Sequence, residues 1–355
     1  MKRNKEKIIN FDFFLLFVLC FIWSSILNNH IAYILLLLPA AIYIFFKIHE
    51  IRILLWILLI SFVPIILNIF IKEFNVFNHL NLWLDNLFHF SLRKILINKV
   101  NADYNEQTAS IINLFIFNIK DSYAYTMYNT IINLSIVHLF VISGLHLSII
   151  KKIFTKKLWF LSYPIIFFYT YLLNFSVSST RVILTFLFDL LFRKIKTNLK
   201  DSCSCAGILS LIIFPKSVTN YGFQMSYFCT LAIISINELK INNWLIKYLL
   251  IDFISITISF PFILEMNNSI SLFTLINGYL FTFISIVILF IFQITFWMNF
   301  LLPMQTYLVI LLINILNCVN LFNAIINVKF WSQIYTAISL TIISCSFIIL
   351  KNLKK

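Results

Sequence analysis

The sequence predicts an all-α polytopic membrane protein with about twelve transmembrane helices, some of them broken or re-entrant. Of its 355 residues, 61% are hydrophobic and 11% are charged, and the mean hydropathy is +0.95. A water-soluble fold of this composition would lack the polar surface needed to cover itself. Apolar stretches recur along the chain, and about 20 such residues cross a hydrocarbon core of ~30 Å as a helix. Period-two alternation is not sustained anywhere, which argues against a membrane barrel.

The apolar stretches place candidate spans at 11–27, 31–46, 53–71, 131–150, 158–175, 180–192, 203–214, 221–236, 244–263, 271–298, 303–322 and 330–350. The span at 203–214 is short, and the span at 271–298 contains Asn277-Gly278, a pair that weakens helix continuity. These features are compatible with a broken or re-entrant helix, and the alternative is a tilted helix or one whose true ends differ from these bounds. Pro261 is expected to kink or end the ninth span.

The basic residues predict the orientation. The first apolar stretch follows a basic head, Met1 to Asn10, and no small-residue cleavage site follows it, so we expect a retained helix. With the amino terminus inside, nineteen of the 27 Lys and Arg residues fall on the cytoplasmic side. Both termini of this plasma-membrane (cytoplasmic membrane) protein are then cytoplasmic. The same rule accounts for the net charge of +14 without nucleic acid.

Four segments are expected: N-terminal helices (1–71), a short extracytoplasmic or interfacial segment (72–130), a helical core (131–298) and C-terminal helices (299–355). The polar segment 72–130 is expected to hold an amphipathic helix at the lipid headgroups. The alternative is that Arg93, Lys94 and Lys99, beside aromatic residues, attract phosphate and stack a base. The six cysteines have no paired spacing, so neither disulfides, nor a metal, nor a cofactor is expected.

Polar groups inside a span cost about 2.5–3.5 kcal/mol when charged, so each needs a reason. The fourth span contains His138, Ser143, Gly144 and His146. The histidines lie about 80° and ~12 Å apart on a helix, too far to share one metal. Gly144 leaves a notch for another helix or a substrate. The alternative is a hydrogen-bonded histidine pair with ordinary small-residue packing.

A second polar cluster follows helical spacing, and its members form one stripe that faces either a pore or a partner helix. They are Ser178, Arg181, Thr185, Asp189 and Arg193. Arg181 lies near the predicted external end, where a guanidinium suits phosphate, and Asp189 is expected to pair with Arg193 or Arg181. The alternative is an internal network that locks helices together.

Two further clusters are weaker on their own. Gly222, Gln224 and Ser226 lead into the eighth span, where a glutamine is more often a contact between helices than a substrate ligand. Pro261 and Asn277 belong to the fourth cluster, which by itself indicates little.

Taken in order, these clusters resemble a known family. His138 to His146 reads HLFVISGLH and resembles the HLLAISGLH motif of the ComEC competence family. Arg181, with the two hydroxyl residues before it, is similar to the PSxxRA stretch. GFQMS at 222–226 is similar to GFQLS. The run from Pro261 through Ser-Ile-Ser to Asn277 follows a later P...iS...N pattern, and the resemblance covers roughly residues 110–290.

The resemblance implies a channel that imports single-stranded DNA across the cytoplasmic membrane in natural transformation. It implies that the His138–His146 helix lies at the pathway, with Arg181 and Gln224 on neighbouring helices. Val182 departs from the alanine of PSxxRA. Residues 72–110 are too short for the OB-like domain of larger members, and no His-x-His-x-Asp-His run is present. We therefore expect no nuclease and no other enzyme activity.

The expected partners are single-stranded DNA, the lipid bilayer and, because the chain has no P-loop, a separate cytoplasmic ATPase or DNA-binding protein. The oligomeric state stays open, and a homo-oligomer is one option. Two rival functions also stay open. One is a lipid or small-solute permease with the histidines as an intramembrane proton relay. The other is an intramembrane lipid-linked enzyme, with Ser143 and His146 as nucleophile and base.

Overall fold

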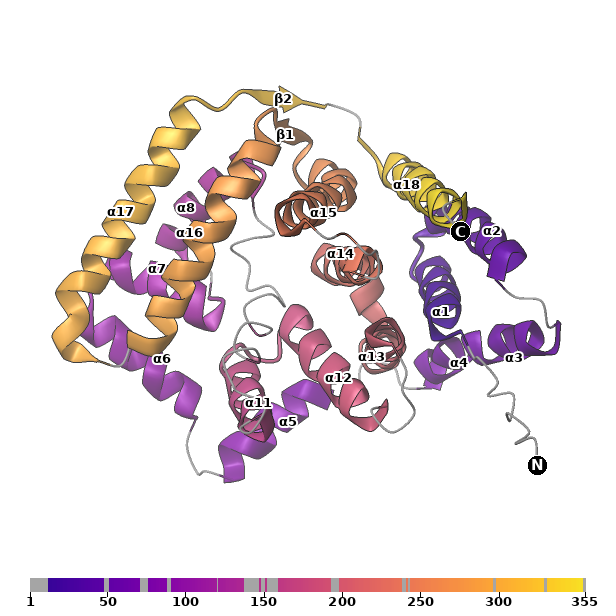
Figure 1. The fold of residues 1–355 in the computed structure, drawn as a ribbon. Coiled ribbons are helices and arrows are strands. Elements are labelled where there is room, and N and C mark those ends of the chain that lie inside the picture. The colour runs from indigo at the N-terminus through magenta and orange to yellow at the C-terminus, as the bar shows by residue number, and fades with distance from the viewer. Residues whose placement is uncertain are drawn as a thin grey trace.

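The computed structural model of the chain is built almost wholly from helices (Figure 1). The structure describes residues 12–47, 51–70, 76–87, 91–119, 121–136, 147, 151, 159–192, 198–237, 241, 243–295, 298–328 and 331–353.

The α-helices are α1 (Phe13–Leu27), α2 (Leu37–Lys47), α3 (Ile51–Ser61), α4 (Val63–Phe70), α5 (Val76–Leu87), α6 (Leu92–Asp103), α7 (Glu106–Phe117), α8 (Ser122–Asn133), α11 (Ser162–Leu172), α12 (Val177–Phe192), α13 (Leu199–Ile213), α14 (Tyr221–Asn237), α15 (Trp244–Asn267), α16 (Thr274–Thr295), α17 (Leu302–Leu321) and α18 (Gln333–Leu353). The 3-10 helices are η1 (Ile31–Leu36), η2 (Trp159–Leu161), η4 (Pro215–Thr219) and η5 (Asn299–Leu301). Strands β1 (Ser269–Ser271) and β2 (Ile325–Asn327) pair antiparallel, with Ile270 opposite Ile326.

Short polar side chains cap the start of several helices. Asp12 accepts a hydrogen bond from the backbone N–H of Leu15 at 3.1 Å and so caps α1. Asn105 caps α7, and Asp121 caps α8, in the same way. Such caps satisfy N–H groups that have no partner within the first helical turn. Asn and Asp side chains therefore mark where α1, α7 and α8 begin.

The helices pack around two apolar cores. The first core is formed by buried side chains of α6, α7, α8, α11, α12, α16 and α17. The second core is formed by α1, η1, α2, α3, α13, α14, α15 and α18. Helix α12 joins them, because Val182 and Phe186 belong to the first core while the same helix packs against α13 and α14. Strand β1 connects α15 of the second core to α16 of the first core, and β2 connects α17 of the first core to α18 of the second. The paired strands therefore link the two cores.

Within segment 72–130, α7 is a core helix. Its residues from Thr108 to Phe117 are all buried, and it packs against α16 and α17. Arg93 on α6 donates from Nε to the carbonyl oxygen of Leu172 at 2.8 Å and from Nη2 to that of Phe117 at 3.2 Å. Burial lowers the pKa of Arg93 from its usual value. This guanidinium therefore caps the carboxyl ends of α11 and α7. The bounds of the four predicted segments stay a prediction.

Apart from 131–150, most of which lies outside the described residues, the predicted spans coincide closely with helices, but their number as membrane crossings is not confirmed. Three helices among the described residues are long and apolar enough to cross a bilayer, namely Trp244–Asn267, Thr274–Gln293 and Asn299–Leu321. Helices such as α1 and α13, with 15 residues each, are shorter than the roughly 20 residues that a full crossing takes. The span predicted at 53–71 is two helices, α3 and α4, which meet at Phe62.

Neither Asn277-Gly278 nor Pro261 ends its helix. Helix α16 runs unbroken through Asn277 and Gly278, because the Asn277 side chain bonds to other segments and the carbonyl of Gly278 accepts from the hydroxyl of Thr282 at 2.7 Å. Helix α15 likewise continues past Pro261 to Asn267. A proline removes a single intrahelical bond, and nearby hydroxyls and neighbouring helices accommodate it in apolar helices.

Large apolar side chains remain exposed over much of the surface. Examples are Phe45, Trp56, Phe283 and Phe300, which are 79%, 63%, 71% and 78% exposed. Apolar surface of this extent calls for lipid around the protein rather than water. The chain is a helical membrane protein.

Gly207 of α13 sets the distance between α13 and α1. A Cβ atom placed there would lie 2.5 Å from Cδ2 of Phe17, whose side chain is fully buried. We predict that Gly207→Ala lowers the stability of the detergent-solubilised protein by about 1–3 kcal/mol through overpacking. Thermal unfolding followed by circular dichroism measures the loss.

The double variant Phe17→Leu with Gly207→Ala is the control, because a smaller side chain at position 17 makes room for the methyl group. Its stability loss is expected to be smaller than the sum of the two single losses. Purely additive losses would show that the two side chains do not meet.

Candidate functional site

Arg181 is a buried cation where α12 meets α14. Its side chain is 6% exposed, and Nη1 donates a hydrogen bond to the backbone carbonyl of Ser226 at 2.9 Å. The guanidinium carbon lies 5.9 Å from the centre of the Tyr227 ring. Its Nε is buried without a hydrogen-bond partner. A guanidinium with an unused donor inside an apolar helix pair is a candidate binding group.

The stripe on α12 faces partner helices. Arg181 and Thr185 are both buried, and the Thr185 hydroxyl donates to the carbonyl of Arg181 at 2.8 Å. Asp189 lies further along and pairs with Lys151, whose Nζ is 3.5 Å from Oδ2. The expected pairing of Asp189 with Arg181 is therefore wrong, because two helical turns separate them on α12. Its other expected partner, Arg193, lies outside the described residues.

Gln224 is a contact between structural elements. Its side chain is fully buried, its Oε1 accepts from the Tyr33 hydroxyl at 3.0 Å, and its Nε2 donates to the carbonyl of Val218 at 2.6 Å. These bonds tie α14 to η1 and η4. Gly222 lies at the start of the same helix, where its N–H donates to the side chain of Asn220 at 2.8 Å.

Asn277 bonds to the segment that precedes the histidine-containing motif. Its Nδ2 donates to the carbonyl of Leu134 and to the hydroxyl of Ser271, both at 3.3 Å. The side chain is 3% exposed. A buried amide with two partners of this kind holds separate segments in register.

A second amide completes this anchor. Asn323 donates to the carbonyl of Asn133 at 2.9 Å and accepts from the Ser271 hydroxyl. The N–H of Ser271 donates in turn to the hydroxyl of Ser135 at 2.9 Å. Residues 133–135 are thus tied to β1 and to the end of α17. Sequence reasoning missed Ser135 and Asn323, since a lone Ser or Asn at a helix end carries no distinctive pattern.

The remaining predicted residues divide into two groups. Pro261 lies buried within α15, and its carbonyl accepts from the Thr336 hydroxyl of α18 at 3.3 Å. The motif residues of the fourth predicted span lie outside the described residues. They are His138, Ser143, Gly144 and His146.

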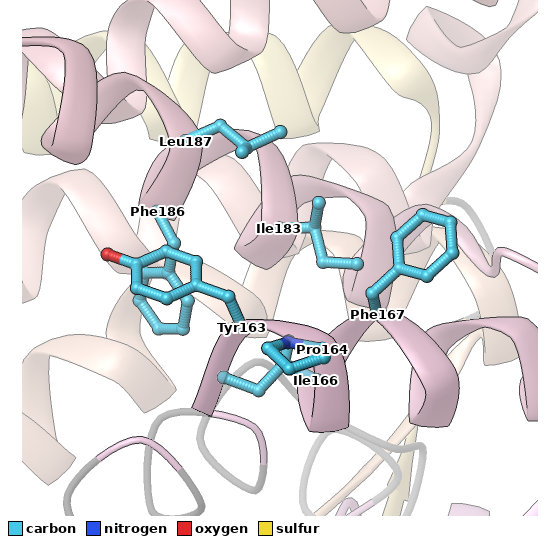
Figure 2. A pocket seen from close by; sticks show the side chains of 7 residues that line it. All are labelled: Tyr163, Pro164, Ile166, Phe167, Ile183, Phe186 and Leu187. Carbon is cyan, nitrogen blue, oxygen red and sulfur yellow. The ribbon is translucent and has the colours of Figure 1, made fainter. Parts of the chain in front are cut away.

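A pocket between α11 and α12 has a volume of about 300 Å³ and is apolar (Figure 2). Its lining is Tyr163, Pro164, Ile166, Phe167, Ile183, Phe186 and Leu187. Lys151 Nζ lies 3.7 Å from the centre of the Phe186 ring. Phe186 is on α12, one turn before Asp189, the ion-pair partner of Lys151. With no charged lining residue, this pocket suits hydrocarbon and does not offer a path for phosphate.

A family model described as "Competence protein" matches residues 115–353. The chain belongs to the Competence protein family. The match confirms the resemblance seen in the motifs, and it extends further toward the carboxyl terminus than residues 110–290. In this family member, Arg181 of the stretch similar to PSxxRA bonds to Ser226 of the GFQMS stretch. Asn277 of the later pattern bonds to the residues that precede the His138–His146 motif.

Two curated relatives each match about half of the chain, and both are named as uncharacterized proteins. Uncharacterized protein MG316 of Mycoplasma genitalium is 28% identical over 198 residues, which cover 54% of this chain and 52% of the relative. The uncharacterized MG316 homolog of Mycoplasma pneumoniae is 27% identical over 189 residues, half of each chain. The chain spans about half the length of the curated relatives it matches. No solved structure matches this family member.

His30 makes one edge of the second core sensitive to pH. It precedes η1, and its Nδ1 pairs with the Nε2 amide of Gln333 at the start of α18. Burial lowers the pKa of His30 below its usual 6.5, and the nearby carboxylate of Glu265 opposes that shift. A depressed folded-state pKa means that the unfolded chain binds the proton more tightly. The stability that neutral His30 contributes is therefore complete above pH 6.5 and is lost as the pH falls through the lowered pKa.

We predict that the unfolding temperature of the solubilised protein drops between about pH 7.5 and about pH 5, and that His30→Asn removes part of this drop. Thermal unfolding of both proteins in one detergent measures the difference. An equal drop in the two proteins would assign the pH dependence to other groups.

Proposed function

We propose that this member of the Competence protein family is a channel that imports single-stranded DNA across the cytoplasmic membrane. The observation that supports the proposal is the environment of Arg181, a buried guanidinium paired with a carbonyl and an aromatic ring. Within the described part of the chain, no carboxylate lies within ion-pair distance of Arg181. Such a charge is costly inside an apolar helix pair, so its retention calls for a ligand that uses it.

A phosphodiester is the anion that fits this environment. Phosphate oxygens accept from several guanidinium N–H groups at once, including the Nε that has no partner in the structure. The Tyr227 ring offers a face on which a base can stack, as in other single-strand binding sites. Entry of the strand replaces the Ser226 carbonyl by phosphate and separates α12 from α14. In this proposal the unoccupied channel is closed.

The rest of the path follows the predicted topology, with both termini in the cytoplasm and several helices crossing the membrane. DNA enters from outside, passes Arg181 and Gln224, crosses beside the helix of His138 to His146, and emerges among cytoplasmic lysines. A separate cytoplasmic ATPase or DNA-binding protein supplies the energy. The protein acts on DNA without chemical change, as a single chain or as a homo-oligomer.

The decisive variant is Arg181→Ala. We predict that it lowers uptake of labelled DNA into nuclease-resistant form by about 10- to 100-fold, which corresponds to the roughly 1.5–3 kcal/mol of one charge-assisted hydrogen bond. Arg181→Lys keeps the charge but loses the fork geometry, so it should recover only part of the uptake. Arg52→Ala is the matched control, because Arg52 is exposed on α3 and its loss removes the same charge.

Uptake is measured in cells that lack the gene and carry each variant at equal membrane abundance. Full uptake with Arg181→Ala would show that Arg181 is not part of the DNA path. Unchanged uptake in the deletion strain itself would favour a permease of lipids or small solutes over a DNA channel.

A further inference from the structure

Asp252 is a buried carboxyl group in the middle of an apolar helix. It lies nine residues into α15, within the candidate membrane span Trp244–Asn267, and its side chain is 8% exposed. Its Oδ2 is buried without a hydrogen-bond partner. An ionisable group at such a depth is expensive, and its presence calls for a function. Neither the family motifs nor the proposed DNA path includes it.

The position of Asp252 is set by the contact between α15 and α16. A Cβ atom at Gly278 of α16 would lie 3.6 Å from Oδ2 of Asp252 and 2.8 Å from Cδ1 of Ile256. The missing side chain at Gly278 therefore makes room for Ile256, one turn along α15 from Asp252, and the carboxyl group lies in ordinary contact with the same glycine. Tyr248 and Tyr279 flank the contact with ring centres 6.0 Å apart, and the Tyr279 hydroxyl donates to the carbonyl of Leu249 at 3.0 Å.

No cation faces this carboxyl group among the described residues. The elements that pack against α15 are α14, α16, α18 and β1. Of these, α14, α16 and β1 contain no Lys, Arg, His, Asp or Glu, and α18 contains a single charged residue, Lys351, in its last turn. On α15 itself, Lys247 lies five residues away and Glu265 thirteen, neither at the spacing that places side chains together on a helix.

We propose that Asp252 is a proton-binding site in the membrane interior. The neutral acid is the form that fits the closed α15–α16 contact, because an unpaired carboxylate without water is far costlier than a carboxylic acid. When the helices separate and water enters, the group releases its proton. The site thereby links the protonation of one residue to the packing of two membrane helices, whether or not the protein carries DNA.

The test uses dicyclohexylcarbodiimide, an apolar reagent that reacts with protonated carboxyl groups. The acid adds across the carbodiimide, its proton moves to a carbodiimide nitrogen, and the adduct rearranges to a stable N-acylurea with no leaving group. The full chain in native membranes is treated at several pH values, digested and analysed by mass spectrometry. We expect the adduct at Asp252, and we expect its yield to fall by about tenfold between about pH 5 and about pH 8.

Two variants and one salt control sharpen the outcome. Asp252→Asn should lose the adduct. Asp189→Asn should leave the adduct yield unchanged, because Asp189 is an ionised partner of Lys151 and is not expected to react itself. Absence of the adduct from the wild-type protein, or a yield independent of pH, would overturn the proposal. Protection by Na⁺ at fixed pH, without protection by choline, would overturn it as well and would indicate a metal-cation site.

Discussion

The hydrogen bond from the buried guanidinium of Arg181 to the Ser226 carbonyl is the interaction on which the arrangement of α12 depends. Helix α12 contributes apolar side chains to the first core on one face, and on another face it must place a charge against α14 of the second core. In an apolar surrounding that charge needs partners, and a carbonyl and an aromatic ring satisfy it only in part. The junction between the two cores is therefore held by a contact that a better anionic partner can replace.

The family motifs work as pairs in this structure. Arg181 bonds to the GFQMS stretch, and Asn277 bonds to the residues just before the His138–His146 motif. Residues that lie far apart in the sequence thus define two junctions. One joins α12 to α14, and the other ties residues 133–135 to β1 through Ser271. Asp252 marks a third junction, between α15 and α16, where Gly278 leaves room for Ile256 beside the carboxyl group. In each case a polar side chain fixes the relation of two apolar elements that hydrophobic packing alone would leave adjustable.

The sequence was sufficient to predict the helical membrane class, because composition and apolar run length depend on local chemistry alone. Nearly every predicted span that falls on described residues corresponds to a helix, and the family followed from ordered motifs. The failures involve tertiary contacts. A break at Asn277-Gly278 was one of two expectations and is absent, because the amide bonds to other segments and the glycine admits Ile256. Of the two partners expected for Asp189 on its own helix, Arg181 does not pair with it and Arg193 lies outside the described residues. The ion pair with Lys151 was not expected, since ion pairs between elements leave no trace in local spacing.

The central claim is that single-stranded DNA passes between α12 and α14 beside Arg181. Replacement of Tyr227 by a photoreactive benzoyl-phenylalanine places a crosslinker at the ring next to the guanidinium while keeping an aromatic side chain there. The same replacement at Trp56, an exposed aromatic residue of α3, is the control. Our account predicts that illumination during DNA uptake attaches labelled DNA to the protein at position 227 and not at position 56. Equal labelling at both positions, or labelling at neither while uptake continues, would contradict it.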